Sequence, residues 1–329
     1  MTEEPKPKLL VVELWGLGDL VIATPFLQAA VRKYAVTVLA KPFARDLQAR
    51  FWPEVEVAPF IAPWTAFLRK YRLLTWPWGE IFGLRRLAAK RFDIGLSARW
   101  GDPRDHLLLW GLRVKKRLGF PRLQSQIFLT DPQLRPPAIS HRYEYWRVLG
   151  GALGIELPPQ QKIPVPPLHG GQLLVHSGAG QPVRVWPLEH YRNLVNRLRQ
   201  LGHSVRIACD PDQRDFWREA AEPDIIAPRT VTELLALMDQ SAVFIGNDSG
   251  PAHLAALCGV PTFTLFGPQV PEWFAPLHPT GEWLEGKPCP YKPCSDYCRF
   301  PVACCMTNLP EEEVWSRLEG FLKRNRIEP

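Results

Sequence analysis

Continuous apolar runs alternate with segments of helical periodicity along most of this chain. KLLVVEL (8–14) and VTVLA (36–40) are almost entirely apolar, which is typical of strands buried in a parallel sheet. The segment between them, 20–33, repeats its apolar residues with a helical period and predicts a helix. Strands that alternate with helices in this way indicate βαβ units built around a parallel sheet.

The alternation then continues and is interrupted once. A strand is expected at 92–100, followed by a helix and a strand over 107–120. The pattern stops at 156–171, where five prolines and a closing Gly-Gly predict a linker. We therefore expect an N-terminal domain over 1–165 and a C-terminal domain over 166–329.

After the linker the alternation restarts. Strands are predicted at 172–178, 203–209, 242–248 and 261–266, and helices at 187–201, after Asp212, and at 230–238, 251–258 and 310–324. Thr230 and Glu233 form the sequence pattern of a capping box, and the terminal helix is available to pack back on the first domain. Two similar halves, each opening with a strand and a glycine-containing loop, predict two Rossmann-like domains with ligands in the cleft between them.

Length and composition agree with a two-domain globular protein. The chain of 329 residues is long for one hydrophobic core, and 46% of its residues are apolar and 22% charged. The N-terminus is acidic where a signal peptide would be basic, and Glu13 and Asp19 interrupt the most apolar stretch, 9–31. We expect a cytoplasmic protein with at most peripheral membrane contact. A formal charge of +7 leaves phosphorylated small molecules, acidic lipid and nucleic acid open as partners.

The first candidate site is LWGLGDL (14–20), at the end of the first strand. Gly16 and Gly18 let the backbone approach a ligand closely, because glycine has no side chain. The third glycine of a dinucleotide fingerprint is missing, and no P-loop sequence occurs. Asp19 follows at a helix start, where it is either a cap for the helix or a general base facing the cleft.

Two further candidate sites lie in the second half. HSGAGQPVRVWPLEHY (176–191) places small residues and Arg184 between a strand and a helix, which predicts a phosphate cradle or an exposed turn. The sequence NDSG precedes a helix whose N-terminal amides and dipole favour an anion. Helix capping by Asp248 or Ser249 and ordinary burial of His253 would explain each of these residues without a ligand.

Together these stretches resemble glycosyltransferase family 9, the ADP-heptose:lipopolysaccharide heptosyltransferases. The resemblance rests on GLGDLVIATPFLQAA, on RVWPLEHYRNLV and above all on FIGNDSGPAHLAALCGVPTFTLFGP, and HRYEYWRVLGGALGI and the Cys-rich tail are also similar to family segments. It implies an α/β GT-B fold, in which two Rossmann-like domains with parallel sheets face an interdomain cleft. It also implies an inverting, metal-independent transfer of heptose or a related sugar from an ADP-sugar to a lipopolysaccharide core acceptor, with no required cofactor.

The resemblance implies roles for individual residues as well. Asp19 matches the family's catalytic aspartate, which takes the proton of the acceptor hydroxyl, and Gly16 and Gly18 lie on the acceptor side. Arg184 stands where many members have a basic residue, commonly lysine, against the donor diphosphate, so the charge is kept while the hydrogen-bond geometry changes. The other residues implied to bind the donor are Gly178, Ala179, Asp248, Ser249, Gly250 and His253.

CPYKPCSDYCRFPVACCM (289–306) contains five of the seven cysteines. Its spacing matches no standard zinc knuckle, and disulfides are disfavoured in a cytosol. Two interpretations of this Cys-rich loop (289–305) stay open: a structural zinc or iron–sulfur site, or reduced thiols that pack a proline-rich loop. The ligands in the first interpretation would be Cys289, Cys294, Cys298 and Cys304. Neither interpretation gives the cysteines a catalytic role.

The stretch 64–91 carries seven Lys/Arg and one Glu among several aromatic residues. No nucleic-acid-binding motif accompanies it, so we expect no nucleic-acid partner. It suits an anionic membrane surface or a phosphorylated glycolipid, and a solvated helix with packed tryptophans is the alternative.

Two other classes of function remain as alternatives. A NAD(P)-dependent oxidoreductase is disfavoured by the incomplete glycine fingerprint and by the second strand, which ends VLAKP without an acidic residue. A non-catalytic metal- or nucleic-acid-binding protein would depend on the Cys-rich loop and on the basic stretch 64–91.

Overall fold

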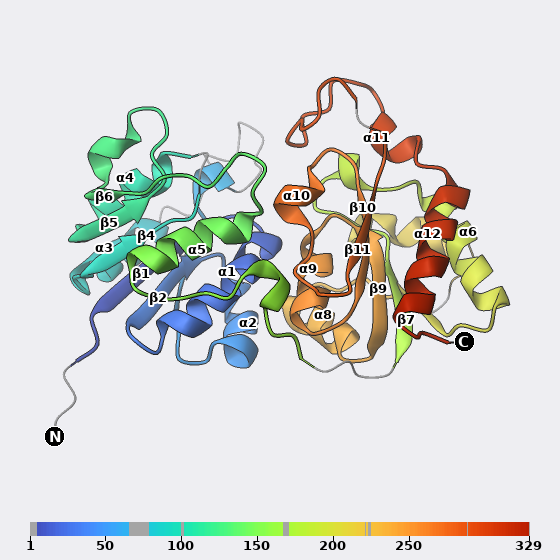
Figure 1. Ribbon diagram of the computed structural model, residues 1–329, viewed down its shortest axis with the longest axis horizontal. Coiled ribbons are helices and arrows are strands. Elements are labelled where there is room, and N and C mark those ends of the chain that lie inside the picture. The colour runs from blue at the N-terminus through green and yellow to red at the C-terminus, as the bar shows by residue number, and fades with distance from the viewer. Residues whose placement is uncertain are drawn as a thin grey trace. The chain divides into compact units, whose positions relative to one another are not determined.

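The computed structural model describes residues 5–65, 79–99, 102–166, 171–220, 222, 225–287 and 289–328. The chain divides into two compact units, Met1–Leu157 and Pro158–Pro329, and each has its own parallel sheet (Figure 1). Along the chain, the boundary after Leu157 falls before the one expected at 165/166, within the same proline-rich segment.

In the described part of the first unit, six strands form a sheet in the order β3-β2-β1-β4-β5-β6. In β1 (Lys8–Glu13) and β2 (Ala35–Ala40) every residue after the first is buried, as their apolar runs predict. The other strands are β3 (Glu56–Pro59), β4 (Ile94–Leu96), β5 (Lys116–Gly119) and β6 (Asp131–Pro132). All the strand pairs are parallel, so the carboxyl ends of the strands meet at one edge of the sheet.

Helices pack against this sheet. They are α1 (Leu17–Ala30), α2 (Ala44–Phe51), α3 (Glu80–Ala89), α4 (Arg104–Gly111) and α5 (Arg142–Ala152). Helices α1 and α5 lie side by side, with the ring centroids of Phe26 and Trp146 5.2 Å apart (Figure 1). Lys33 Nζ and the Tyr34 hydroxyl both donate to the carbonyl of Leu153, just after α5. These contacts hold α5, which the alternation did not predict, beside the helix that follows β1.

In the described part of the second unit, five strands form a sheet in the order β11-β10-β9-β7-β8. They are β7 (Gln172–His176), β8 (Val205–Ala208), β9 (Ser241–Asn247), β10 (Thr262–Phe266) and β11 (Glu282–Glu285). The helices are α6 (Leu188–Gln200), α7 (Arg214–Glu219), α8 (Val231–Met238), α9 (Gly250–Leu257), α10 (Pro271–Phe274), α11 (Cys304–Thr307) and α12 (Glu311–Arg324). Strand β9 is central and buried along its whole length, which explains its uninterrupted apolar sequence before Asn247.

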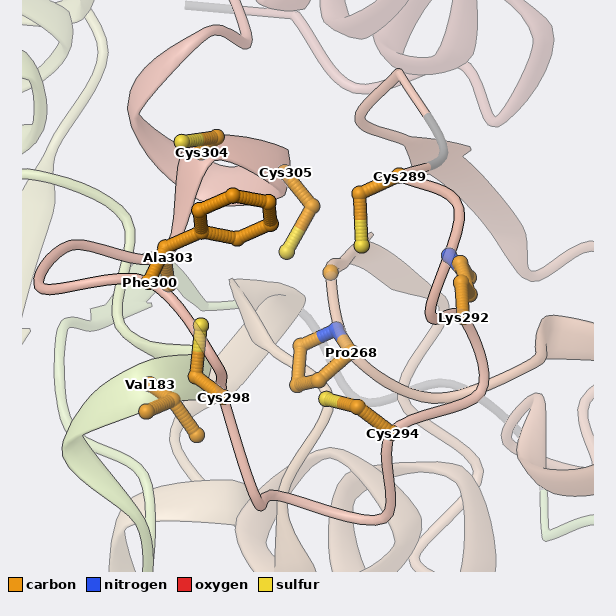
Figure 2. A pocket seen from close by; sticks show the side chains of 11 residues that line it. Val183, Pro268, Cys289, Lys292, Cys294, Cys298, Phe300, Ala303, Cys304 and Cys305 are labelled. Atoms are coloured by element: carbon orange, nitrogen blue, oxygen red, sulfur yellow. The ribbon is translucent and has the colours of Figure 1, made fainter.

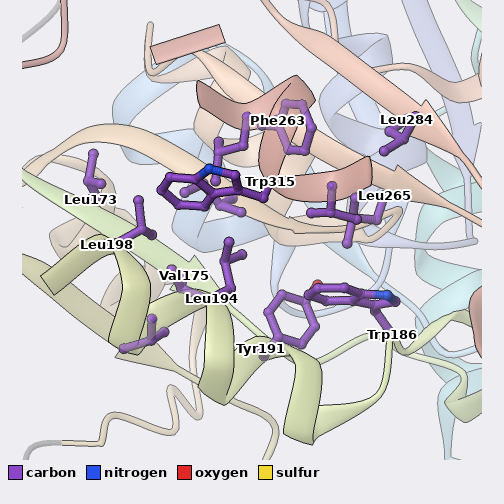
Figure 3. Packing of buried hydrophobic residues seen from close by; sticks show 14 of the residues in the cluster. Leu173, Val175, Trp186, Tyr191, Leu194, Leu198, Phe263, Leu265, Leu284 and Trp315 are labelled. Atoms are coloured by element: carbon purple, nitrogen blue, oxygen red, sulfur yellow. The ribbon is translucent and has the colours of Figure 1, made fainter. Parts of the chain in front are cut away.

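The C-terminal helix α12 closes the hydrophobic core of the second unit (Figure 3). Phe321 packs on Phe263 of β10 with ring centroids 5.6 Å apart, and Arg197 of α6 lies 4.1 Å from the ring centroid of Trp315. Aromatic side chains bury more apolar area than other residues, so this helix contributes strongly to the core. The terminal helix therefore packs on its own unit, against α6 and β11.

Most predicted elements coincide with observed ones, and two local expectations differ. The strand expected at 92–100 shortens to β4, because the chain leaves the sheet after Leu96 and carries Arg99 into a loop. Thr230 caps α8 as predicted, with its Oγ1 accepting the Glu233 amide at 3.1 Å. The Glu233 carboxylate, however, accepts from the amide of Arg229, one residue before the position that a capping box requires.

Residues 66–78, the middle of the basic stretch 64–91, lie outside the described residues. Its expected membrane contact therefore stays a prediction. The part that is described includes α3, where Phe82 is exposed and Arg85 lies 5.8 Å from its ring centroid. Within the described ranges, no helix combines the length and the apolarity needed to cross a bilayer.

Candidate functional site

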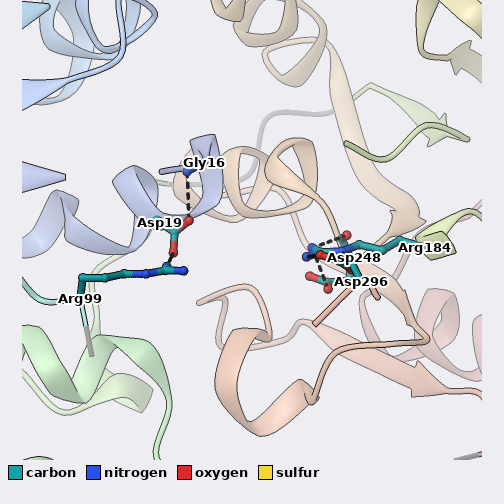
Figure 4. Close-up of polar contacts among 6 residues, drawn as sticks. All are labelled: Gly16, Asp19, Arg99, Arg184, Asp248 and Asp296. Carbon is teal, nitrogen blue, oxygen red and sulfur yellow. Dashed lines mark hydrogen bonds and ion pairs between the residues drawn. The ribbon is translucent and has the colours of Figure 1, made fainter. Parts of the chain in front are cut away.

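Asp19 lies in the first turn of α1, just after the carboxyl end of β1. The amide of Gly16, the residue before α1, donates to Asp19 Oδ2 at 3.1 Å. A Cβ at residue 16 would be 3.2 Å from that oxygen, so glycine lets the carboxylate approach the backbone closely. Asp19 Oδ1 is 3.7 Å from Arg99 Nη1 (Figure 4). The Asp19 carboxylate therefore caps the start of α1. Its side chain is 25% exposed, so a ligand can still reach the carboxylate.

Charged side chains from several elements line a pocket beside Asp19. Glu13 ends β1, Arg99 follows β4 and Arg142 begins α5. Arg99 lies over Trp15, with its Cζ 3.6 Å from the ring centroid, so its guanidinium has a defined position. The pocket thus brings two guanidinium groups and two carboxyl groups together within the first unit.

Glu13 is buried beside Asp19, and its environment disfavours a second negative charge. Burial raises the pKa of Glu13 well above its usual range; Asp19 raises it further, and Arg99 opposes both effects. The uncharged acid is therefore favoured, which reduces repulsion between the two neighbouring carboxyl groups. Burial likewise raises the pKa of Asp105, whose charge also acts on Glu13, to about 7.

In the second unit, Asn247 joins three segments around the candidate donor site. It is the last residue of β9 and is fully buried. Its Oδ1 accepts the Trp186 amide at 3.0 Å and the Tyr191 hydroxyl at 2.9 Å. Its Nδ2 donates to the carbonyls of Ser177 at 2.8 Å and Gly178 at 3.3 Å. A single side-chain amide thus fixes the loop after β7 and the start of α6 at the end of β9.

The loop after β7 depends on glycine at position 178. A Cβ there would lie 2.4–2.6 Å from the Asp210 carboxylate atoms, whereas a Cβ at Gly180 would meet nothing within 4 Å. The Gly178 amide donates to His176 Nδ1 at 3.2 Å, and burial lowers the pKa of His176, which favours the neutral ring that accepts this bond. Ala179 follows as a buried residue. The loop after β7 is therefore closely packed at Gly178 and carries only small side chains there.

Two buried polar atoms near the start of α9 have no hydrogen-bond partner among the described residues. Ser249 is the N-cap residue of α9, but its Oγ makes no capping bond, and His253 Nδ1 is unpaired one turn further on. Burial, and then Arg184, lower the pKa of His253 to about 4, so its ring is neutral at neutral pH. A buried polar atom without a partner costs about 1–3 kcal/mol. Their position at a helix N-terminus indicates a site for an anionic ligand.

Arg184, at the end of η5 (Pro182–Arg184), directs its guanidinium at two carboxylates (Figure 4). Its Nε and Nη2 donate to Asp296 at 2.7 and 2.6 Å, and its Nη1 donates to Asp248 Oδ2 at 3.2 Å. Asp248 directly follows β9, while Asp296 comes from the Cys-rich loop. An anion that binds Arg184 must therefore share the guanidinium with these carboxylates or displace one of them.

The structure gathers the residues predicted to bind the donor within three neighbouring segments of the second unit. These are the loop after β7, η5 and the start of α9, with Gly178, Ala179, Arg184, Asp248, Ser249, Gly250 and His253. Gly16, Gly18 and Asp19 lie together at the start of α1 in the first unit.

Sequence reasoning missed several polar residues at these sites, namely Glu13, Arg99, Arg142, Asn247 as a structural centre, and Asp296. Glu13 and Asn247 had a usable signal, because each is a polar residue that ends a buried strand. Arg99 and Asp296 had none, since their partners are far away in the sequence.

The four cysteines of the metal-site interpretation, Cys289, Cys294, Cys298 and Cys304, do not assemble into a metal site among the described residues. In the described parts of the chain, no three His, Cys, Asp or Glu side chains lie close enough to hold a metal ion together. The Cys-rich loop nevertheless lines a pocket with five cysteines (Figure 2).

Comparison with known proteins identifies relatives of the chain. The family model described as glycosyltransferase family 9 (heptosyltransferase) matches residues 160–299. Lipopolysaccharide heptosyltransferase 3 of Escherichia coli strain K12 is 31% identical over 104 residues, which cover 29% of this chain and 30% of that protein. The lipopolysaccharide core heptosyltransferase OpsX of Haemophilus influenzae is 23% identical over 227 residues, 61% of this chain and 65% of that protein. The chain thus aligns with less than two thirds of the length of each.

The fold has close counterparts among solved structures. Escherichia coli heptosyltransferase WaaC with ADP superposes with a TM-score of 0.72 at 18% identity, covering 95% of this chain and 99% of that one. Escherichia coli ADP-heptose lipopolysaccharide heptosyltransferase II gives a TM-score of 0.70 at 18% identity, with coverage of 97% and 99%. Together with the two parallel sheets, these likenesses confirm the expected α/β GT-B fold.

Proposed function

We propose that this chain, whose residues 160–299 match the model of glycosyltransferase family 9, is an enzyme of that family and transfers a heptose or related sugar from an ADP-sugar to a lipopolysaccharide core acceptor. Solved relatives are described with ADP and with ADP-2-deoxy-2-fluoro heptose, and the curated relatives are lipopolysaccharide heptosyltransferases. The proposal extends those ligands and that reaction class to this chain.

The observation that carries the proposal is the start of α9. Among the residues that the structure describes, Ser249 Oγ and His253 Nδ1 are buried without hydrogen-bond partners, next to the amides of a helix N-terminus and near Arg184. A diphosphate supplies the oxygen acceptors and the negative charge that such a site favours. Gly178 and Ala179 would then let the nucleotide approach the backbone of the loop after β7.

Charge balance suggests how the bond to the leaving group breaks. As the sugar–phosphate bond cleaves, its electron pair passes to the ADP phosphate oxygen, and negative charge grows there. Arg184 and the α9 N-terminus are fixed positive groups that stabilise this charge, so the proposed transfer needs no metal ion or cofactor.

Asp19 is proposed as the general base. It takes the proton from the acceptor hydroxyl as that oxygen attacks the anomeric carbon, and attack opposite the leaving group inverts the configuration. The Gly16 amide and Arg99 hold the Asp19 carboxylate in position, while the protonated form favoured at Glu13 leaves one carboxylate to act as the base. Arg99 and Arg142 line the same pocket and suit an acidic acceptor.

The test is Asp19→Asn, which removes the base and keeps the side-chain shape. Turnover of ADP-heptose with a lipopolysaccharide core acceptor should fall by about 10²–10⁴-fold, while the Kd for ADP stays near the wild-type value. Glu54→Gln, an exposed change in the same unit, is the matched control and should keep full turnover. Near-normal turnover by a folded Asp19→Asn protein would show that Asp19 is not the general base. Failure of the wild-type chain to bind ADP or any ADP-sugar would remove the proposed function.

A further inference from the structure

Large apolar side chains are exposed at one edge of the first unit's sheet. Helix α4 and the short 3₁₀ helix η3 (Ser125–Phe128) pack together there, beside β5 and the edge strand β6 (Figure 1). Five side chains from these segments and from the loop after β6 are 44–89% exposed and form what is called here the α4–η3 surface: Leu107, Trp110, Leu123, Ile127 and Leu134. Single exposed apolar residues are common, whereas a group of them marks an interaction site.

Contacts between α4 and η3 bring these side chains together. Leu107 and Trp110 lie three residues apart on α4 and therefore share one face of the helix. The rings of Trp110 and Phe128 have centroids 5.9 Å apart, although more than half of Trp110 stays exposed. His106 Nδ1 lies 2.9 Å from Ser125 Oγ in a buried hydrogen bond. The exposed residues of α4 and η3 therefore lie in one area and not singly.

The turn before η3 and the loop after β6 extend this area. Arg135 donates from its Nη2 to the carbonyl of Pro121, which places the neighbouring Leu134 close to the turn. Leu123 has a φ angle of 51°, a conformation that is uncommon for residues other than glycine. Its side chain is nevertheless 77% exposed. The turn thus presents a leucine to the exterior in a strained conformation that burial does not explain.

The α4–η3 surface lies in a basic part of the chain. Residues 104–139 contain seven Lys/Arg and two Asp. Asp105 is buried, and Asp131 is ion-paired with a lysine of the same segment. Arg113, just after α4, and Arg122, directly before Leu123, are both exposed. Exposed arginines therefore flank the apolar side chains.

We propose that the α4–η3 surface docks on a phospholipid bilayer that carries negative charge. The apolar side chains enter the region between headgroups and acyl chains, while Arg113 and Arg122 meet lipid phosphates. Tryptophan is favoured at this boundary, because its ring is apolar and its N–H is polar, and Trp110 takes that place. The surface differs from the stretch 64–91, for which membrane contact was expected from composition.

Charge argues against a second copy of the chain as the occupant. A symmetric dimer would join the same patch from both chains and bring the arginines of each toward those of the other. Like charges that face one another across an interface disfavour it. An acidic partner avoids this repulsion. Ile127 and Leu134, at 70% and 89% exposure, project from turns, and a fluid bilayer accepts projecting side chains without a matching cavity.

The test is co-sedimentation of the full-length chain with large unilamellar vesicles at low ionic strength, with no ADP-sugar present. The wild type should bind vesicles of phosphatidylcholine mixed with phosphatidylglycerol, and should bind pure phosphatidylcholine about tenfold more weakly. Because the readout needs neither donor nor turnover, the proposal is independent of the proposed glycosyl transfer and its outcome is separate.

The apolar part of the surface is tested by the double variant Leu123→Ser, Ile127→Ser. Its partition coefficient for the mixed vesicles should fall by about tenfold, because two side chains that enter the bilayer are lost. Leu201→Ser changes an exposed leucine at the end of α6 in the second unit and is the matched control. It should bind as the wild type does, and both proteins should keep the far-ultraviolet circular dichroism of the wild type.

The charged part is tested by the double variant Arg113→Gln, Arg122→Gln. Binding to the mixed vesicles should fall by about 10–30-fold, since each cation near an anionic surface contributes about fivefold. Arg218→Gln with Arg229→Gln removes two exposed arginines of the second unit and should leave binding near the wild-type value.

Several results would overturn the proposal. They are a wild-type chain that does not bind the mixed vesicles, surface variants that bind as the wild type does, and controls that lose as much binding as the surface variants. A dimer in sedimentation velocity that Leu123→Ser with Ile127→Ser abolishes would replace the bilayer by a second copy. Poly-glutamate bound as tightly as the vesicles, and through the same two arginines, would replace it by an acidic protein.

Discussion

The side chain of Arg184 is already hydrogen-bonded to two carboxylates in the structure. Its guanidinium donates to Asp296 at two positions and to Asp248 at a third. Asp248 is almost fully buried, whereas Asp296 belongs to an irregular loop and is the carboxylate more easily displaced. A diphosphate that reaches Arg184 therefore competes mainly with Asp296.

Asp296→Asn should tighten ADP binding, because it removes a negative charge that competes for Arg184. We expect the Kd to fall roughly two- to fivefold, which corresponds to an ion pair of about 0.5–1 kcal/mol at a partly exposed site. Isothermal titration calorimetry at low ionic strength measures the change. Asp215→Asn, an exposed carboxylate on α7, is the control for net charge and should leave the Kd unchanged. Weaker binding by Asp296→Asn would show instead that Asp296 orients Arg184 for the ligand.

At the scale of secondary structure, several polar residues of the candidate sites are the last residues of strands. Glu13 ends β1, His176 ends β7 and Asn247 ends β9. Because the strands of each sheet are parallel, their carboxyl ends share one edge, and the following loops carry the chemistry-bearing side chains. In the second unit, the loop after β7 has no room for a side chain at Gly178.

Gly178→Ala should damage this loop, because the added Cβ would lie within 2.6 Å of the Asp210 carboxylate. We expect a loss of stability of about 1–3 kcal/mol, as for overpacked sites, together with weaker ADP binding. Thermal melts and titration calorimetry measure the two effects. Gly180→Ala makes the same chemical change two residues later with nothing within 4 Å, and should match the wild type. Equal behaviour of the two variants would show that the contact with Asp210 does not constrain the loop.

At the scale of the whole molecule, each unit has its own sheet and its own hydrophobic core. Every residue assigned to the donor site lies within Pro158–Pro329, and Asp19 with its pocket lies within Met1–Leu157. The two halves of the proposed reaction are therefore assigned to separately organised units.

The fragment 158–329 should fold alone and bind ADP with a Kd close to that of the full chain, because it holds all the donor residues. ADP at 100 times its Kd should add about 2.7 kcal/mol to the stability of this fragment and raise its melting temperature. The fragment 1–157 should show no such shift. Loss of ADP binding by a folded 158–329 fragment would show that the first unit contributes to the donor site.

Much of the fold could be predicted because the relevant signals are local. The buried strands β1, β2, β7 and β9 appear as apolar runs, and α6 and α12 appear as periodic segments. The helices α2 and α5 were not predicted, and a helix in the region of α3 was only one of two alternatives for the stretch 64–91. Their apolar residues pack on partners supplied by distant segments, as Trp146 does on Phe26.

The amino-acid sequence by itself determined the alternation of strands and helices, and the glycine-containing and polar loops at their ends, with Asp19, Arg184 and Ser249 among them. Only the tertiary structure decided which charges meet: Arg99 with Asp19, and Arg184 with Asp296 from 112 residues away. It also decided that, of two adjacent cysteines that line one pocket, Cys305 turns its sulfur toward the other thiols and Cys304 turns its sulfur away. The physical reason is that periodicity and turn chemistry act over a few residues, whereas ion pairs and ligand sets depend on which strand ends and loops the packed core brings together.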